Sequence, residues 1–131
     1  MRENLFHGKR KDNGDWVEGC LLGSDVIVPK GQPFYICHNI LDSALKAYEV
    51  IPETVGQHIE RKDKNGTKIF EGDIVRDAET SDVGKIFFDT YTAMFVIGFE
   101  NTIADFNASY SLEVIGNIYD NPELIGGTND G

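Results

Sequence analysis

The sequence predicts a mainly β protein, arranged as small barrels or as a sandwich. Two stretches, Arg10–Gly19 and Arg61–Gly72, each contain a charged run and an Asn-Gly pair followed by apolar residues. This is the pattern of two strands joined by a tight turn. Many other short apolar runs alternate with turn residues, and few stretches have the length of a helix. A chain of 131 residues can fill two small cores, so we expect two modules that share an interface.

The first module, residues 1–58, opens with a predicted hairpin from Leu5 to Leu22 around Asn13-Gly14. Apolar and polar side chains alternate on its second strand, as they do in a strand with one buried face. Pro52 ends the last strand of the module, and the segment 52–60 forms the boundary between the modules. The elements expected in between are a second hairpin of Asp25–Val28 with Phe34–His38, a short helical turn over Asn39–Lys46, and a strand over Tyr48–Ile51.

The second module, residues 59–125, begins with the turn at Asn65-Gly66, and a strand follows it. Gly72 then allows the chain to bend before apolar residues resume. Residues 126–131 are mostly glycine and polar residues, which predicts a disordered tail. Asn121-Pro122 is expected to begin a final turn. The strands expected in this module are Lys68–Phe70, a short one at Ile74 and Val75, Val83–Phe88, Ala93–Phe99 and Leu112–Tyr119.

Charge is distributed unevenly along the chain, whose formal net charge is −10. Residues 1–58 hold six bases and eight acids, a net charge of −2, whereas residues 59–131 hold six bases and fourteen acids, a net charge of −8. A field of this sign repels phosphate backbones, so we expect no direct binding of nucleic acid. Surface carboxylates also keep small proteins soluble, and this is their commonest role.

The composition also bears on location. No apolar run approaches the roughly 20 residues that a membrane-spanning helix needs, and the first residues lack the pattern of a secretory signal. Cys20 and Cys37 are too few for a disulfide framework, and we expect them to remain thiols. The sequence therefore predicts a cytoplasmic protein that does not enter a membrane.

Several segments together resemble the YopX-like family of phage and prophage proteins. The central segments are Pro52–Gln57, Asp63–Gly66 and Ile69–Val75, while Gly8–Val17 is similar to the opening hairpin of that family and Glu113–Leu124 to its closing strand. The motifs occur in the same order as in the family and cover nearly the whole chain. The resemblance implies an SH3-like barrel in the second module, packed with the N-terminal β-hairpin module, a phage origin and a bacterial host cell. It assigns no catalytic residue.

The chain departs from the family pattern at Glu60 and Arg61. The family tends toward a glycine and then an apolar residue at these positions. A glycine would let the backbone adopt a positive φ at low cost.

Candidate sites for chemistry fail on spacing. Asp63–Thr67 begins like a calcium loop, but Lys68 occupies the position of the required glycine and Ile74 that of the bidentate glutamate. Cys37 and His38 are adjacent, and neighbouring side chains of an extended segment point to opposite faces. The sequence thus predicts neither a calcium loop nor a thiolate–imidazole pair.

The other titratable residues predict no metal centre and no cofactor. His7, His58 and Cys20 lack the short ligand spacings of zinc sites. The carboxylates of residues 73–82 surround a turn, where such groups are usually solvated, so only weak ion binding would be possible there. An enzyme would require a cleft assembled from distant strands.

The sequence favours a non-enzymatic protein–protein interaction module that presents a groove or an exposed strand edge. Its partner would be a protein, with another copy of the chain as one candidate. The alternative is an acidic mimic of nucleic acid that occupies a host DNA-binding protein, because residues 77–131 hold ten acids and one base. The aromatic residues that could line a groove are Trp16, Tyr91, Tyr110 and Tyr119. Packing in the core is the commoner role of such residues. The candidate contact residues are Arg61, Lys62, Asp63, Lys64, Glu71, Asp73, Asp77, Glu79 and Asp82.

Overall fold

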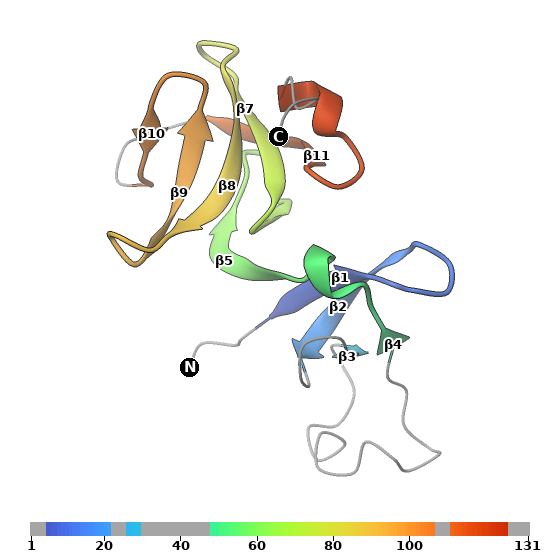
Figure 1. Cartoon of the computed structure of the whole chain (residues 1–131). Helices are drawn as coiled ribbons and strands as arrows, with labels where there is room; N and C mark the ends of the chain where they lie inside the picture. Colours follow the sequence, from blue (N-terminus) through green and yellow to red (C-terminus); the bar gives the residue numbers. More distant parts are fainter. Residues whose placement is uncertain (1–4, 22–25, 30–47, 107–110, 126–131) are drawn as a thin grey trace. The chain divides into compact units, whose positions relative to one another are not determined.

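A computed structural model describes residues 5–21, 26–29, 48–106 and 111–125, and it is mainly β (Figure 1). The chain divides into two compact units, Met1–His58 and Ile59–Gly131. The described strands form two antiparallel sheets. No helix in this part of the chain has the length and apolar character needed to cross a bilayer.

The first unit is built on the hairpin that the sequence predicts. Strand β1 (Phe6–Lys9) pairs antiparallel with β2 (Trp16–Leu21). Gly14, in the turn between them, has a φ of 78°, a left-handed conformation that glycine adopts without steric cost. The Asn-Gly hairpin is therefore confirmed.

The strands that extend this sheet differ in part from the expectation. Strand β3 (Val26–Pro29) pairs with β2 on one side, and on the other side it pairs with β4 (Tyr48–Glu49), a strand about twenty residues later in the chain. The strand expected at Tyr48 is confirmed, although it is shorter than predicted. The predicted strand Phe34–His38 and the predicted helical turn Asn39–Lys46 lie outside the described residues.

The segment expected to be a boundary contains regular structure. A 3₁₀ turn, η2 (Pro52–Thr54), is followed by strand β5 (Gly56–Lys62). The predicted Asn65-Gly66 hairpin implies a strand before its turn, but this strand begins within the segment 52–60 that was expected to be a boundary. Only one residue of β5 has a large aliphatic side chain, so β5 lacks the alternation of apolar and polar residues that predicts a strand. Gly56 and Gln57 pair with β1, and β6 (Lys68–Phe70) is the other neighbour of β5.

Close packing holds the first unit together. Leu5, Ile27 and Val50 are buried, and a side chain at Gly8 would come within 3.1 Å of Val50. His7 lies against Trp16, with 4.5 Å between the ring centroids. Burial lowers the pKa of His7 to about 4, so this imidazole is neutral at physiological pH.

The second unit contains an open five-stranded sheet in the order β10-β9-β8-β7-β11. Gly72, with a φ of 95°, forms the bend before β7, as the sequence predicts. The final turn at Pro122 is also confirmed, as η3 (Pro122–Ile125). The strands are β7 (Asp73–Asp77), β8 (Val83–Asp89), β9 (Met94–Phe99), β10 (Ile103–Ala104) and β11 (Leu112–Asn117).

Neither sheet closes on itself among the described residues, so the mainly β fold is confirmed and the SH3-like barrel is not. Strand β11 approaches the turn between β5 and β6 through hydrogen bonds rather than a strand ladder. The amide of Lys64 donates to the carbonyl of Leu112 over 2.9 Å, and the carboxylate of Asp63 accepts from the amide of Val114 over 2.9 Å.

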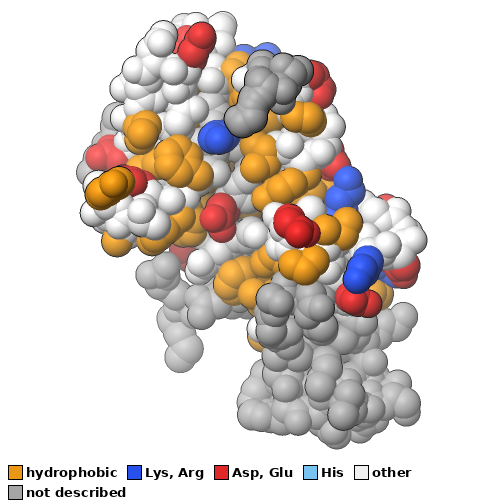
Figure 2. Space-filling model, in the orientation of Figure 1, with side chains coloured by type: hydrophobic (Ala, Val, Ile, Leu, Met, Phe, Trp, Pro, Cys, Tyr) orange, Lys and Arg blue, Asp and Glu red, His pale blue; other side chains and the backbone are white. Residues whose placement is uncertain are grey.

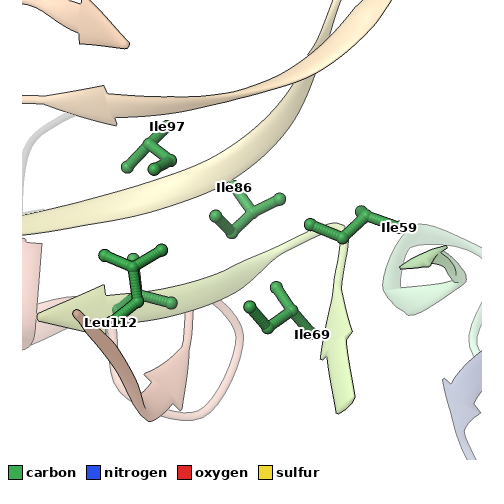
Figure 3. Close-up of a cluster of buried hydrophobic side chains, with 6 residues drawn as sticks. Ile59, Ile69, Ile86, Ile97 and Leu112 are labelled. Carbon is green, nitrogen blue, oxygen red and sulfur yellow. The ribbon is translucent and has the colours of Figure 1, made fainter. Parts of the chain in front are cut away.

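Six buried side chains, one from each of β5, β6, β7, β8, β9 and β11, form the core of the second unit. Figure 3 shows several of them pointing toward one another between the strands. Val96 and Ile97 are both buried although they point to opposite faces of β9, so this strand is covered on both faces at its centre. The core residues are Ile59, Ile69, Val75, Ile86, Ile97 and Leu112.

Candidate functional site

An open pocket lies at the end of β5 in the second unit, with a volume of about 290 Å³. Residues 60–63 form one side of it. Ile69, Leu112 and Phe106 supply apolar surface, and the first two of these belong to the core described above. The pocket therefore opens onto the hydrophobic core, and the charged residues 60–63 make up the rest of its lining.

Two exposed cations stand at this pocket, Arg61 and Lys62. The guanidinium carbon of Arg61 lies 5.1 Å from the centroid of the Phe106 ring, within the range of a cation–π contact. On the face shown in Figure 2, hydrophobic side chains also reach the surface of the second unit between acidic and basic ones. Glu60 and Asp63 also line the pocket, so its apolar surface lies beside two cations and two acids whose formal charges cancel.

Glu60, which also lines the pocket, has a φ of 68°. This left-handed conformation costs a residue with a side chain roughly 1–2 kcal/mol. It occurs at the position where the chain departs from the glycine of the YopX-like pattern. A glycine would adopt this conformation without that cost, and the strain lies beside the pocket.

Replacing Glu60 with glycine should therefore stabilise the protein. We expect Glu60→Gly to raise the free energy of unfolding by about 0.5–1 kcal/mol, because relief of the left-handed strain exceeds the entropy that glycine loses on folding. Urea denaturation measures the change. Arg61→Gly is the matched control, because Arg61 does not have a positive φ and should lose stability. A loss of stability in Glu60→Gly would contradict the prediction.

Asp63 is a structural residue, and not the surface contact that the sequence suggested. Its side chain is only 9% exposed. One carboxylate oxygen accepts from the amides of Asn65 and Thr67 at 2.8 and 2.9 Å, and the other accepts from Val114 at 2.9 Å. Burial opposes ionisation, but these three donors outweigh it and hold the pKa of Asp63 below its usual value.

Asp73 is also buried, at 6% exposure, so it is not available as a contact residue. Its carboxylate accepts a hydrogen bond from the amide of Phe70 over 2.8 Å. Burial raises the pKa of Asp73 to about 7, the hydrogen bond from Phe70 opposes this shift, and the nearby charge of Asp63 adds to it. Asp73 is therefore close to half-protonated at neutral pH.

A third predicted contact residue, Asp77, is 5% exposed and accepts from the amide of Glu79 over 3.0 Å within the turn that follows β7. Burial thus removes Asp63, Asp73 and Asp77 from the predicted surface. Arg61, Lys62, Lys64, Glu79 and Asp82 are exposed, and Glu71 is half-buried. Only Arg61, Lys62 and Asp63 of the predicted set line the pocket.

The aromatic residues do not form the single groove that the sequence suggested. Tyr91 is 98% exposed, whereas Tyr119 packs its ring against Gly72, where an added Cβ would lie 3.2 Å from the ring. Trp16 contacts His7 in the first unit, and Tyr110 lies outside the described residues.

The part of the chain that is described contains no group of three or more His, Cys, Asp or Glu side chains placed to hold a metal ion. Cys20 is an exposed thiol. Cys37 and His38 fall outside the described residues.

Sequence reasoning missed the apolar half of the pocket. Phe106 is separated from Arg61 by more than forty residues in the sequence, and no local sequence pattern at either residue predicts their contact. The adjacent pair Asp105-Phe106 carries no turn or strand pattern. Phe106 follows β10, and only the tertiary packing of the second unit brings it to Arg61 at the end of β5.

Comparison with known proteins agrees with the motifs described above. A family model described as YopX protein matches residues 5–126. No curated protein shows significant similarity to the chain. Since the match spans both units and nearly the whole sequence, the chain belongs to the YopX family.

Proposed function

We propose that this protein is a non-enzymatic interaction module of phage origin, acting in the cytoplasm of a bacterial host cell. Its second unit binds a segment of a protein partner at the pocket formed by residues 60–63, Ile69, Phe106 and Leu112. The observation that carries this proposal is an opening onto the core in which Ile69, Leu112 and Phe106 lie beside charged residues that include two exposed cations, Arg61 and Lys62.

The size and chemistry of the pocket define the segment that it fits. A volume of about 290 Å³ is at the lower limit of ligand pockets, so it suits one large side chain better than a whole small molecule. Aromatic side chains are frequent anchors of protein interfaces. Arg61 and Lys62 would attract carboxylates beside that anchor. The expected partner segment therefore carries one aromatic residue with acidic neighbours.

The shifted carboxylates of the second unit support a structural role over a catalytic one. Asp63 and Asp73 both accept hydrogen bonds from backbone amides of turns, and neither is exposed. The ionised Asp63 stabilises the fold around the pocket in this way, whereas burial disfavours the ionised form of Asp73. Their altered pKa values follow from burial and local hydrogen bonds, which structural carboxylates also experience.

A relationship to SH3-like barrels is part of the same proposal. The turn after β5 meets β11 through Asp63 and Lys64. These hydrogen bonds join the β5–β6 hairpin to the edge of the five-stranded sheet. Contacts of this kind are what a small, partly open barrel would use in place of a complete ladder.

Peptide binding tests the proposal. The probe is a fluorescent peptide with one tryptophan between glutamates, and its two controls replace the tryptophan with alanine or the glutamates with lysines. We expect the first peptide alone to bind, and the double variant Arg61→Glu, Lys62→Glu to bind it about tenfold or more weakly, because the reversed charges repel it.

Lys64→Glu combined with Lys68→Glu provides the matched charge reversal, since these residues belong to the same hairpin but do not line the pocket. This control should bind the peptide as the unmodified protein does. Equal binding of all three peptides, or equal loss in both double variants, would refute the proposal.

The acidic nucleic-acid mimic remains the second candidate. Exposed Glu79 and Asp82 favour it, but burial of Asp63, Asp73 and Asp77 removes three carboxylates from the surface that a mimic would present. If the protein is a nucleic-acid mimic, the double variant Glu79→Gln, Asp82→Asn should bind a DNA-binding partner protein more weakly, and this binding should fall steeply with salt concentration. The pocket proposal predicts that this double variant behaves as the unmodified protein does.

A further inference from the structure

A second and larger pocket opens on the five-stranded sheet of the second unit, with a volume of about 720 Å³. Ligand sites commonly have volumes of roughly 300–1,000 Å³. The lining comes from β8 and β9, from the turns that precede β8 and follow β9, and from η3. The second pocket shares no lining residue with the one beside Arg61, so the two are separate sites of one unit.

Apolar surface is accessible in the second pocket. Leu124 of η3 is 37% exposed although its side chain is large and aliphatic. The other apolar residues of the lining are half-buried, which leaves part of each side chain in contact with solvent; they are Val83, Phe99 and Ile125. Covering such surface with a partner side chain is favourable, because it removes apolar area from water.

One position of the lining has no side chain. Gly98 of β9 pairs with Lys85 of β8, and an added Cβ at Gly98 would come within 2.8 Å of the Phe87 ring. The ammonium group of Lys85 also lies near this ring, with its nitrogen 6.0 Å from the ring centroid. Phe87 is not part of the lining, so the charged end of Lys85 is turned toward a residue outside the pocket.

The lining contains two acids, Asp82 and Glu100, and one base, Lys85, so its formal net charge is −1. Both carboxylates are exposed, and neither forms an ion pair with another described residue. Residues 77–131 add to the negative field, since they hold ten acids and Lys85 is their only base. The charges of the lining and of its surroundings therefore both favour a cationic ligand.

Backbone hydrogen bonds fix the two turns beside the second pocket. The amide of Ser81 donates to the carbonyl of Asp77 over 2.7 Å, and the amide of Asp77 donates to the carbonyl of Asp82 over 2.9 Å. In the other turn the amide of Phe99 donates to the carbonyl of Thr102 over 2.8 Å. A site that is ordered before binding loses less entropy when it takes a ligand.

We propose that the second pocket binds a short segment of a protein partner, which carries two aliphatic side chains beside lysine or arginine. The aliphatic side chains cover the apolar lining, and the cations approach Asp82 and Glu100. Two anchors are needed because this pocket has more than twice the volume of the one beside Arg61, and a single side chain would leave much of it open. The inference adds a site with its own chemistry and does not depend on the first.

Fluorescence anisotropy of a labelled peptide tests the inference. The probe has two leucines separated by one serine and flanked by lysines, because side chains two residues apart share a face of an extended segment. One control peptide has alanines in place of the leucines, and the other has glutamates in place of the lysines. We expect the probe alone to bind, and the pocket variant, Asp82→Lys with Glu100→Lys, to bind it about tenfold or more weakly.

Glu79→Lys with Glu123→Lys is the matched charge reversal, since these exposed acids belong to the same unit and do not line the second pocket. It has the same net charge as the pocket variant and should keep most of the binding. The double variant Arg61→Glu, Lys62→Glu should bind the probe at least as tightly as the unmodified protein does. The pocket variant should still bind the tryptophan–glutamate peptide, so each site can be measured without the other.

The inference is overturned if the probe does not bind the unmodified protein or if the glutamate control peptide binds as tightly. Equal loss of binding in the two lysine double variants would also overturn it, because net charge alone would then explain the attraction. Self-association of the chain that the probe reverses would make a second copy the occupant, which contradicts the assignment to a partner. Binding of the tryptophan–glutamate peptide in any of these cases leaves the proposed function in place.

Discussion

Asp63→Ala should destabilise the second unit more than any other single substitution considered, by about 4 kcal/mol. The substitution leaves three backbone amides, those of Asn65, Thr67 and Val114, without their acceptor. Hydrogen bonds to a charged group contribute roughly 1.5–3 kcal/mol each, and water can replace part of those in the exposed turn. Urea denaturation measures the loss, and hydrogen exchange of the Val114 amide should accelerate with it.

Asp82→Ala is the matched control, because Asp82 is an exposed acid of the same unit and should change stability by less than about 0.5 kcal/mol. Asp63→Asn should fall between the two. Its amide oxygen can accept from Asn65 and Thr67, but its NH₂ group would face the amide of Val114 as a second donor. A loss of less than about 1 kcal/mol in Asp63→Ala would contradict the structural role.

Asp73 should make the stability of the second unit fall as pH rises from about 4 to about 7. The usual pKa of an aspartate is 3.8, and in the folded chain that of Asp73 is about 7. Between these values the folded state binds a proton that the unfolded state has released, so raising the pH favours unfolding. Each unit of pKa difference corresponds to about 1.4 kcal/mol, which gives a total on the order of 4 kcal/mol.

Asp73→Asn tests this effect. The amide cannot ionise, and its oxygen can still accept from Phe70, so the variant should match the unmodified protein near pH 3.5 and exceed it by about 4 kcal/mol at pH 8. Urea denaturation across this range, taken as the difference between the two proteins, is the measurement. A difference that does not change with pH would show that Asp73 titrates normally.

The measurement compares the free energies of unfolding of the two proteins because His7 changes stability with pH in the direction opposite to Asp73. Its pKa is lowered from 6.5 to about 4, so the unfolded state binds the extra proton and stability rises with pH across that interval. His7 is present in both proteins, so its contribution cancels in the difference between their free energies of unfolding. Asp73 and His7 thus contribute opposite pH dependences between about pH 4 and 6.5, each caused by burial of the side chain.

Local signals explain why most strands of the second unit could be predicted. The Asn-Gly pairs at residues 13–14 and 65–66, and Gly72, specify left-handed turn conformations through neighbours in the sequence alone, and all three glycines have positive φ. Strands β8 and β9 are rich in β-branched and aromatic residues, and this composition predicts strands. The start of strand β5 escaped prediction because its residues show no apolar alternation and its pairing with β1 depends on a distant partner, whereas the Asn-Gly turn to β6 marks only its end.

The buried carboxylates show where composition misleads. Asp63, Asp73 and Asp77 were expected at the surface because acids are rarely buried. Each instead accepts hydrogen bonds from amides two to four residues away, and Asp63 accepts a further one from β11. An aspartate immediately before or within a turn carries a recognisable sequence signal for such a role.

The sequence by itself determined the mainly β class, the positions of the tight turns, the acidic charge and the family, since each depends on residue type or on near neighbours. Tertiary structure alone decided that the sheets stay open among the described residues, that Asp63 and Asp73 are buried, and that Arg61 meets Phe106 beside a pocket. These features arise from pairing between strands far apart in the chain, and the energy of burial depends on which side chains that pairing brings together.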